Sequence, residues 1–211
     1  FMLASIDAKS ALAGEGDKNA AGTLLIGFIN DFANSFHQFE AVELFADLAF
    51  SVGQFQTAGE YYQRMVNSPW PEMQTYGRLR LAHAIAGQGQ FGEALTQYEA
   101  VAKNDATTPE LRAIVAEAQA GRARCLGETG KAAEGIAAVE KIIADNDPKT
   151  QKKLYAQAYN AQGVCYRKNN QNKDAILAFL HTHLIFNQDP DAHAESLYHL
   201  TQLWEAESKA D

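Results

Sequence analysis

Apolar residues recur along most of this chain with the period of an α-helix, and polar residues occupy the positions between them. Residues 175–184 show the pattern clearly, because Ala175, Ile176, Phe179, Leu180 and Leu184 fall on one stripe of a helix. Alanine is abundant while proline and β-branched residues are sparse, which also favours helices over strands. The pattern therefore predicts an all-α fold.

The apolar stripes predict pairs of helices joined by short turns. The first helix of each complete pair is expected at residues 40–52, 75–87, 114–128 and 154–168. The second helix is expected at residues 57–66, 92–103, 132–144 and 173–187. Residues 1–13 and 20–32 predict an earlier pair, and residues 191–209 predict a last helix without a partner. The chain should thus form about eleven helices.

The turns inside the pairs repeat one another. They begin at Gly53, Gly89, Gly130 and Asn170, at spacings of 36, 41 and 40 residues. A small residue and then a large one follow each turn, at Ala58 and Tyr62, Ala94 and Tyr98, Gly135 and Val139, and Ala175 and Phe179. Glycine or asparagine at the turn supplies the left-handed residue that ends a helix. Prolines at Pro69, Pro109, Pro148 and Pro190 are expected to stop the second helices.

The turn motif G-x-[FY]-x-x-A-x-x-x-[YF], the helix pairs and the prolines resemble tetratricopeptide repeats (TPRs). The resemblance covers nearly the whole chain, although the units exceed the family's repeat of about 34 residues. Two departures are Ala132 and Asn172, which replace the turn aromatic. The resemblance implies a right-handed superhelical solenoid of antiparallel helix pairs with a C-terminal capping helix. The single repeat domain 1–211 would comprise units at 1–35, 36–70, 71–106, 107–148 and 149–190, with the capping helix at 191–209.

Residues 28–55, FINDFANSFHQFEAVELFADLAFSVGQF, are similar to a joint found in bacterial cell-envelope TPR proteins. A periplasmic or envelope location is therefore expected. The formal net charge of −8 argues against a nucleic-acid partner and against docking on an anionic membrane, because both require clustered cations. No apolar run reaches the length of a membrane-spanning helix. Cys125 and Cys165 are expected to be free, buried thiols on adjacent first helices, too far apart for a disulfide.

The stretch FLHTHLIF at residues 179–186 contains an H-x-H pair, a pattern that holds metal ions in some enzymes. Each residue advances by about 100° around a helix, so His181 and His183 should point to opposite sides. His183 shares the stripe of Phe179 and should be partly buried. His193 and His199 are also poorly spaced for one ion. No catalytic motif or phosphate-binding loop is present, so we expect no enzyme activity and no cofactor.

The resemblance implies a peptide-binding groove lined by the first helices. The groove positions carried over are Glu40, Glu43, Asp47, Phe50, Tyr76, Leu79, His83, Glu117, Ala120, Arg124, Gln157, Asn160, Val164, Arg167, Lys168, Glu195, Tyr198 and Gln202. The strongest candidates are Glu43, Asp47, Tyr76, His83, Arg124, Asn160, Val164, Arg167, Lys168 and Tyr198. Asn160 stands out, because an amide can both donate to and accept from a peptide backbone. The groove would be acidic towards its N-terminal end and basic in its C-terminal half.

The leading functional hypothesis is a non-enzymatic scaffold that binds a protein or peptide partner in this groove. The ends of the repeat array also offer surfaces for self-association. Two alternatives stay open: a metal-binding protein or enzyme that uses the C-terminal histidines, and a structural spacer domain of a larger envelope protein.

Overall fold

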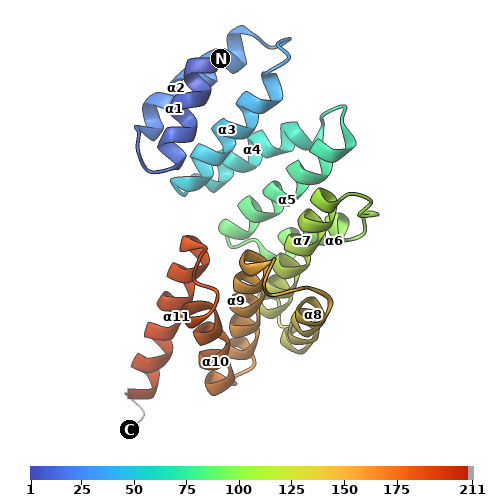
Figure 1. Ribbon diagram of the computed structural model, residues 1–211, viewed down its shortest axis with the longest axis vertical. Coiled ribbons are helices and arrows are strands. Elements are labelled where there is room, and N and C mark those ends of the chain that lie inside the picture. Colours follow the sequence, from blue (N-terminus) through green and yellow to red (C-terminus); the bar gives the residue numbers. More distant parts are fainter. Residues whose placement is uncertain (209–211) are drawn as a thin grey trace. The chain divides into compact units, whose positions relative to one another are not determined.

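The computed structural model describes residues 1–208, which form α-helices and no β-strand (Figure 1). The eleven helices of this part are α1 (Met2–Leu12), α2 (Lys18–Asp31), α3 (Gln38–Ser51), α4 (Phe55–Val66), α5 (Pro71–Gly87), α6 (Phe91–Ala102), α7 (Pro109–Glu128), α8 (Ala132–Asp145), α9 (Lys152–Lys168), α10 (Asn172–Leu184) and α11 (Pro190–Ser208). The all-α class and every predicted helix are confirmed. The predicted end of the last helix, Lys209, lies outside the described residues.

The prediction for the prolines was right at two positions and wrong at two. Pro69 and Pro148 lie just after the ends of the second helices α4 and α8, as predicted. Pro109 and Pro190, in contrast, are the first residues of α7 and α11, so they open first helices instead of ending second helices, and Pro71 opens α5 in the same way. Proline suits this position because its missing N–H would have no partner in the first turn and its φ is already helical. As a result, α5 and α7 begin four and five residues before the apolar stripes that predicted them.

The left-handed residues at the turns are where the sequence predicted them. Gly53, Gly89 and Gly130 have φ values of 77°, 77° and 84°, and Asn170 has a φ of 59°. Asparagine is among the few residues with a side chain that visit this region readily. In the first pair the corresponding residue is Gly14, at a φ of 90°.

The predicted register of small and large residues is confirmed in all four complete pairs. The four small residues and the four large ones that follow them are all buried: Ala58, Ala94, Gly135, Ala175, Tyr62, Tyr98, Val139 and Phe179. Small residues also let helices approach where a large side chain crosses. A Cβ atom at Gly163 would lie 2.6 Å from the ring of Phe179, and one at Gly87 would lie 2.8 Å from Phe55.

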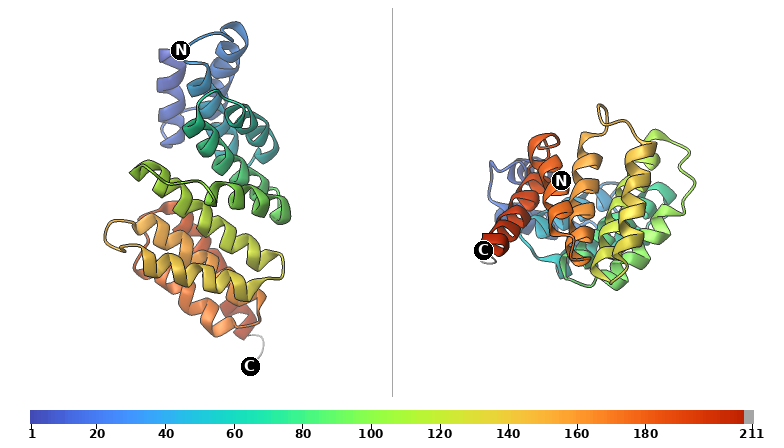
Figure 2. Two further views of the ribbon diagram at one scale, coloured as in Figure 1. Left: turned by 90° about the vertical axis from the view of Figure 1, so that its right-hand side faces the viewer. Right: turned by 90° about the horizontal axis from the view of Figure 1, so that it is seen from below.

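The helices gather into two compact units, Phe1–Gln97 and Tyr98–Asp211, which divide within α6. In the first unit α1 packs against α2 and α3, and α4 packs against α3 and α5. In the second unit α9 packs against α7, α8, α10 and α11, so it is the central helix. Figure 2 shows the consecutive helix pairs of this unit stacked on one another. The first helices α7, α9 and α11 therefore form a continuous row.

Candidate functional site

The row of first helices in the second unit carries most of the polar side chains that the sequence singled out. We call the surface formed by α7, α9 and α11 the first-helix surface. One part of it is a network of mutually bonded side chains, and another part is an open pocket.

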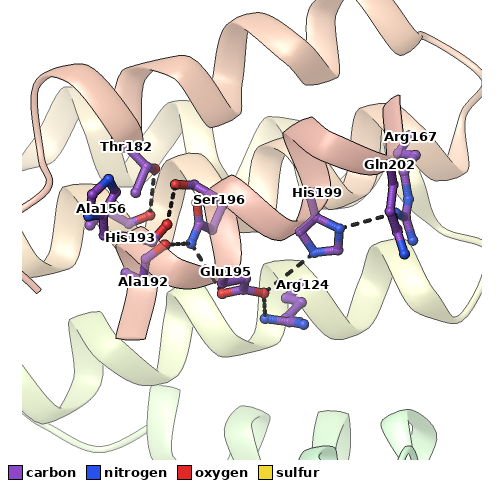
Figure 3. Close-up of polar contacts among 11 residues, drawn as sticks. Arg124, Ala156, Arg167, Thr182, Ala192, His193, Glu195, Ser196, His199 and Gln202 are labelled. Carbon is purple, nitrogen blue, oxygen red and sulfur yellow. Dashed lines mark hydrogen bonds and ion pairs between the residues drawn. The ribbon is translucent and has the colours of Figure 1, made fainter. Parts of the chain in front are cut away.

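The network centres on Glu195 of α11 (Figure 3). Its carboxylate forms an ion pair with Arg124 of α7 and accepts a hydrogen bond of 3.1 Å from Nδ2 of Asn160 on α9. Burial alone would raise the pKa of Glu195, but the hydrogen bond with His199 and the positive charge of Arg124 outweigh burial and lower it. Glu195 is thus a half-buried, ionised carboxylate that connects all three helices.

His199 extends the network towards the C-terminal end of α9. Nη1 of Arg167 lies 3.1 Å from Nδ1 of His199 and donates a bond of 2.8 Å to Gln202 (Figure 3). A guanidinium can only donate, so Nδ1 accepts and Nε2 carries the ring proton. Nε2 in turn faces Glu195 at 3.7 Å. The ring stacks on Phe179 at 4.7 Å, which fixes its plane within the core.

Several of the predicted groove residues face α11 and not solvent. Asn160 is 1% exposed and donates a second bond, of 2.8 Å, to the backbone oxygen of Ala192. Val164 is also 1% exposed and packs in the core with Leu200. The open-groove expectation therefore fails at these two positions, because α11 covers them. Lys168 and Tyr198 are exposed, as expected.

The charged residues predicted for the groove have partners within the chain. Lys168 pairs with Glu128 at 2.6 Å, and in the first unit Asp47 pairs with Arg80. Tyr62 also donates a bond of 2.5 Å to Asp47. Asp47, one of the residues expected to make the N-terminal end of the groove acidic, is therefore paired with a positive charge.

Arg80 lies among aromatic rings in the first unit, and reading the sequence did not identify it. Its guanidinium carbon lies 5.8 Å from the ring centre of Phe50, 5.5 Å from Tyr62 and 5.9 Å from Tyr76. The available signal was its position four residues after Tyr76, which puts both side chains on one helix face.

Glu43 lies on α3 beside this aromatic group. Its pKa is raised, first by burial and then by the negative charge of Asp47, while a hydrogen bond with Tyr76 opposes the shift. His83 is half-buried on α5, three residues after Arg80. Glu43 and Tyr76 thus meet where Asp47 of α3 pairs with Arg80 of α5 in the first unit.

The open part of the first-helix surface is a pocket of about 630 Å³ between the N-terminal halves of α7 and α9. Glu117 and Gln157, both predicted groove positions, line it, and Nε2 of Gln157 lies 3.4 Å from Oε1 of Glu117. Arg112 and Lys153 also line it and were missed. They stand at the starts of the first helices, outside the apolar stripes used to locate the groove.

Arg112 provides a cation that the protein itself does not use. Its side chain is exposed, and it forms no ion pair or hydrogen bond with the side chains described in residues 1–206. Lys153 has one distant contact, 3.9 Å from Asp189. The pocket therefore presents two positive groups, the carboxylates of Glu117 and Asp145, and an amide beside small apolar side chains such as Ala113 and Ala116.

The H-x-H histidines point to different neighbours, as helical geometry predicted. His181 stacks on Tyr159 at 4.5 Å, whereas Nδ1 of His183 lies 2.8 Å from Nε2 of His193. His183 is half-buried, as expected. Among residues 1–208 we find no group of three or more histidine, cysteine, aspartate or glutamate side chains placed to hold a metal ion.

The two cysteines are free and buried, which confirms the prediction for both. Burial raises the pKa of Cys125 to about 12 and that of Cys165 to about 11. Cys165 also donates a hydrogen bond of 3.3 Å to the backbone oxygen of Ala123. Neither thiol has the lowered pKa of a nucleophilic cysteine.

Comparison with solved structures finds TPR proteins. TTC0263, a TPR protein of Thermus thermophilus, is 15% identical, with a TM-score of 0.58 over 93% of this chain and 96% of that one. MamA from Desulfovibrio magneticus RS-1 is 19% identical, with a TM-score of 0.46 over 82% and 97%. The TPR domain of P58(IPK) is 13% identical, with a TM-score of 0.44 over 100% and 56%. No family model and no curated protein matches the sequence.

The helix pairs, the repeated left-handed turns and, in the second unit, the row of first helices are those of a helical-repeat protein. Together with the likeness to TTC0263, they show that the chain has the TPR fold. Within the described residues, no helix has both the length and the apolar character needed to cross a membrane.

Proposed function

We propose that this chain is a protein-interaction module that binds an extended peptide in the pocket between α7 and α9. The observation that carries the proposal is the unpaired guanidinium of Arg112 at a pocket of about 630 Å³ on the first-helix surface. Solenoids of this kind present extended surfaces formed by successive repeats, and such surfaces suit a protein partner.

The chemistry of the pocket suits a peptide. Arg112 and Lys153 can meet carboxylate or carbonyl oxygens, and the amide of Gln157 can both donate to and accept from a peptide backbone. Ala113 and Ala116 leave room for apolar side chains of the partner. A few directed polar groups over an apolar floor are typical of binding sites.

The bonded network around Glu195 has a different role in this proposal. The charged groups of Glu195 and Arg124 and the amide nitrogen of Asn160 are bonded to one another, so a ligand would have to break charge-assisted bonds to use them, although Oδ1 of Asn160 is buried without a partner. Arg124 and Asn160 would therefore hold α11 in place and shape the surface without contacting the peptide. We also propose that the module acts in the cell envelope, supported by the resemblance of residues 28–55, and fractionation of the native host would test this.

The test begins with selection of random dodecapeptides on the full chain, followed by fluorescence anisotropy on the selected peptides. We expect the double variant Arg112→Ala, Gln157→Ala to weaken binding by about tenfold or more, since it removes a charge-assisted contact and an amide contact. The control is Gln63→Ala, Arg64→Ala on α4, where both residues are exposed. Equal affinity of the two variants would refute the proposed location.

A further inference from the structure

A second groove lies on the second helices, away from the pocket proposed above. It has a volume of about 460 Å³ and runs between α6 and α8, with α7 beneath it. Its lining residues are Glu99, Ala102, Lys103, Gln119, Arg122, Ala138, Lys141 and Ile142.

The floor of the groove is apolar. Ala102 of α6 and Ala138 of α8 are half-buried, and Ile142 is 3% exposed. Ile142 belongs to the same apolar core as Val139 and Leu154, so the floor is backed by tight packing. A ligand side chain could rest on this floor without disturbing the helices.

The rim of the groove is positively charged. Lys103, just after α6, and Lys141 of α8 line it, and neither ammonium group forms an ion pair or hydrogen bond among the side chains described in residues 1–206. Arg122 of α7 donates from Nε to Oε1 of Glu99 at 3.4 Å, which holds its guanidinium at the groove. Three cations thus face one carboxylate, in a chain whose formal net charge is −8.

We propose that this groove binds an acidic segment of a partner protein. Carboxylate side chains would meet the three cations, and apolar residues between them would contact the floor. Charge complementarity of this kind sets the register and the association rate of a partner. A nucleic acid fits less well, because its continuous phosphates would meet Glu99 and gain nothing from the apolar floor. The proposal is independent of the pocket between α7 and α9.

The test uses a fluorescein-labelled dodecapeptide with the repeat Glu-Leu-Glu-Ala and measures anisotropy on the full chain at low and at moderate salt. The double variant Lys103→Glu, Lys141→Glu should lose tenfold or more in affinity, about 1.4 kcal/mol or more. Binding to the unmodified chain should weaken as salt rises, since the rim cations are exposed.

The matched control is Lys131→Glu, Lys173→Glu, which makes the same change in net charge at exposed positions outside the groove. It should bind the peptide within about twofold of the unmodified chain. The milder Lys103→Gln, Lys141→Gln variant tests the groove even if charge reversal disturbs folding. The proposal is overturned by absent binding, by equal loss in the groove and control variants, or by an oligothymidylate that binds as tightly as the peptide.

Discussion

Glu195→Gln is the most direct test of the network on the first-helix surface. The substitution keeps the shape of the side chain and one acceptor oxygen, but it removes the charge that faces Arg124. It also turns one of the two carboxylate oxygens into an NH2 group, which cannot accept a bond from Arg124 or Asn160. We expect the second unit to become less stable, because a half-buried charge-assisted network loses its central anion.

The size of the expected loss of stability depends on how far Glu195 and Arg124 are exposed to water. Hydrogen bonds to charged groups contribute about 1.5–3 kcal/mol, against about 0.5–1.5 kcal/mol for neutral pairs. The side chain of Glu195 is 26% exposed and that of Arg124 is 36% exposed, so water partly replaces the lost partner. We therefore expect a loss of about 1–2 kcal/mol at neutral pH.

The pH dependence gives a sharper criterion. The pKa of Glu195 is lowered in the folded chain, so the unfolded chain binds its proton more readily. The stabilisation by Glu195 is fully present above the ordinary glutamate pKa and is lost as pH falls through the lowered value. The difference between the unmodified chain and Glu195→Gln should therefore shrink below about pH 4.5.

The measurement can be confined to α11. Its Trp204 lies nine residues after Glu195, and the other tryptophan, Trp70, belongs to the first unit. In a Trp70→Phe background, urea unfolding followed by fluorescence reports on α11. The control Glu140→Gln changes an exposed residue of α8 and should shift the midpoint little. A Glu195→Gln loss that is the same at pH 7 and pH 3, or no loss at all, would refute the account.

Three further results are expected. Gly163→Ala should destabilise the chain by about 1–3 kcal/mol in urea unfolding, since its Cβ would enter a phenyl ring, whereas Gly92→Ala has open space and should be neutral or stabilising. Asn170→Ala should cost about 1 kcal/mol and Asn170→Gly almost nothing, because only the first is strained at a φ of 59°. Cys125 and Cys165 should react with a thiol reagent at pH 8 only after denaturation, since both are buried and their pKa values are raised.

The fold was readable from the sequence because its determinants are local. Gly53 and Asn170 end helices through their own φ values, and the small and large residues that follow are set by helical spacing. The helix starts at Pro71 and Pro109 were placed too late, because the apolar stripe begins only where the helix meets its neighbours. Pro71 and Pro109 mark the starts of these helices better than the first apolar residue of the stripe does.

The candidate site was only partly readable, because its contacts join residues far apart in the sequence. Arg124 and Glu195 are 71 residues apart, and Arg80 and Asp47 are 33 apart. The register placed Arg124, Asp47 and Glu195 on first helices, but it could not show that they pair within the chain. Arg112 was missed because it is a candidate only by having no partner for its guanidinium among the described side chains, and the sequence does not show which charges are paired.

Paired and unpaired charges on the first-helix surface should have different roles, the first in stability and the second in binding. Charges that pair across helices, such as Arg124 with Glu195, hold successive first helices together and so preserve the shape of the surface. Charges that remain unpaired among the side chains described in residues 1–206, such as Arg112, are the ones a partner can use without breaking the protein's own bonds. Loss of Arg112 should then reduce binding and leave stability unchanged, and Glu195→Gln should first reduce stability. If either substitution reduced peptide binding and stability to the same extent, the proposed separation of the two roles would be refuted.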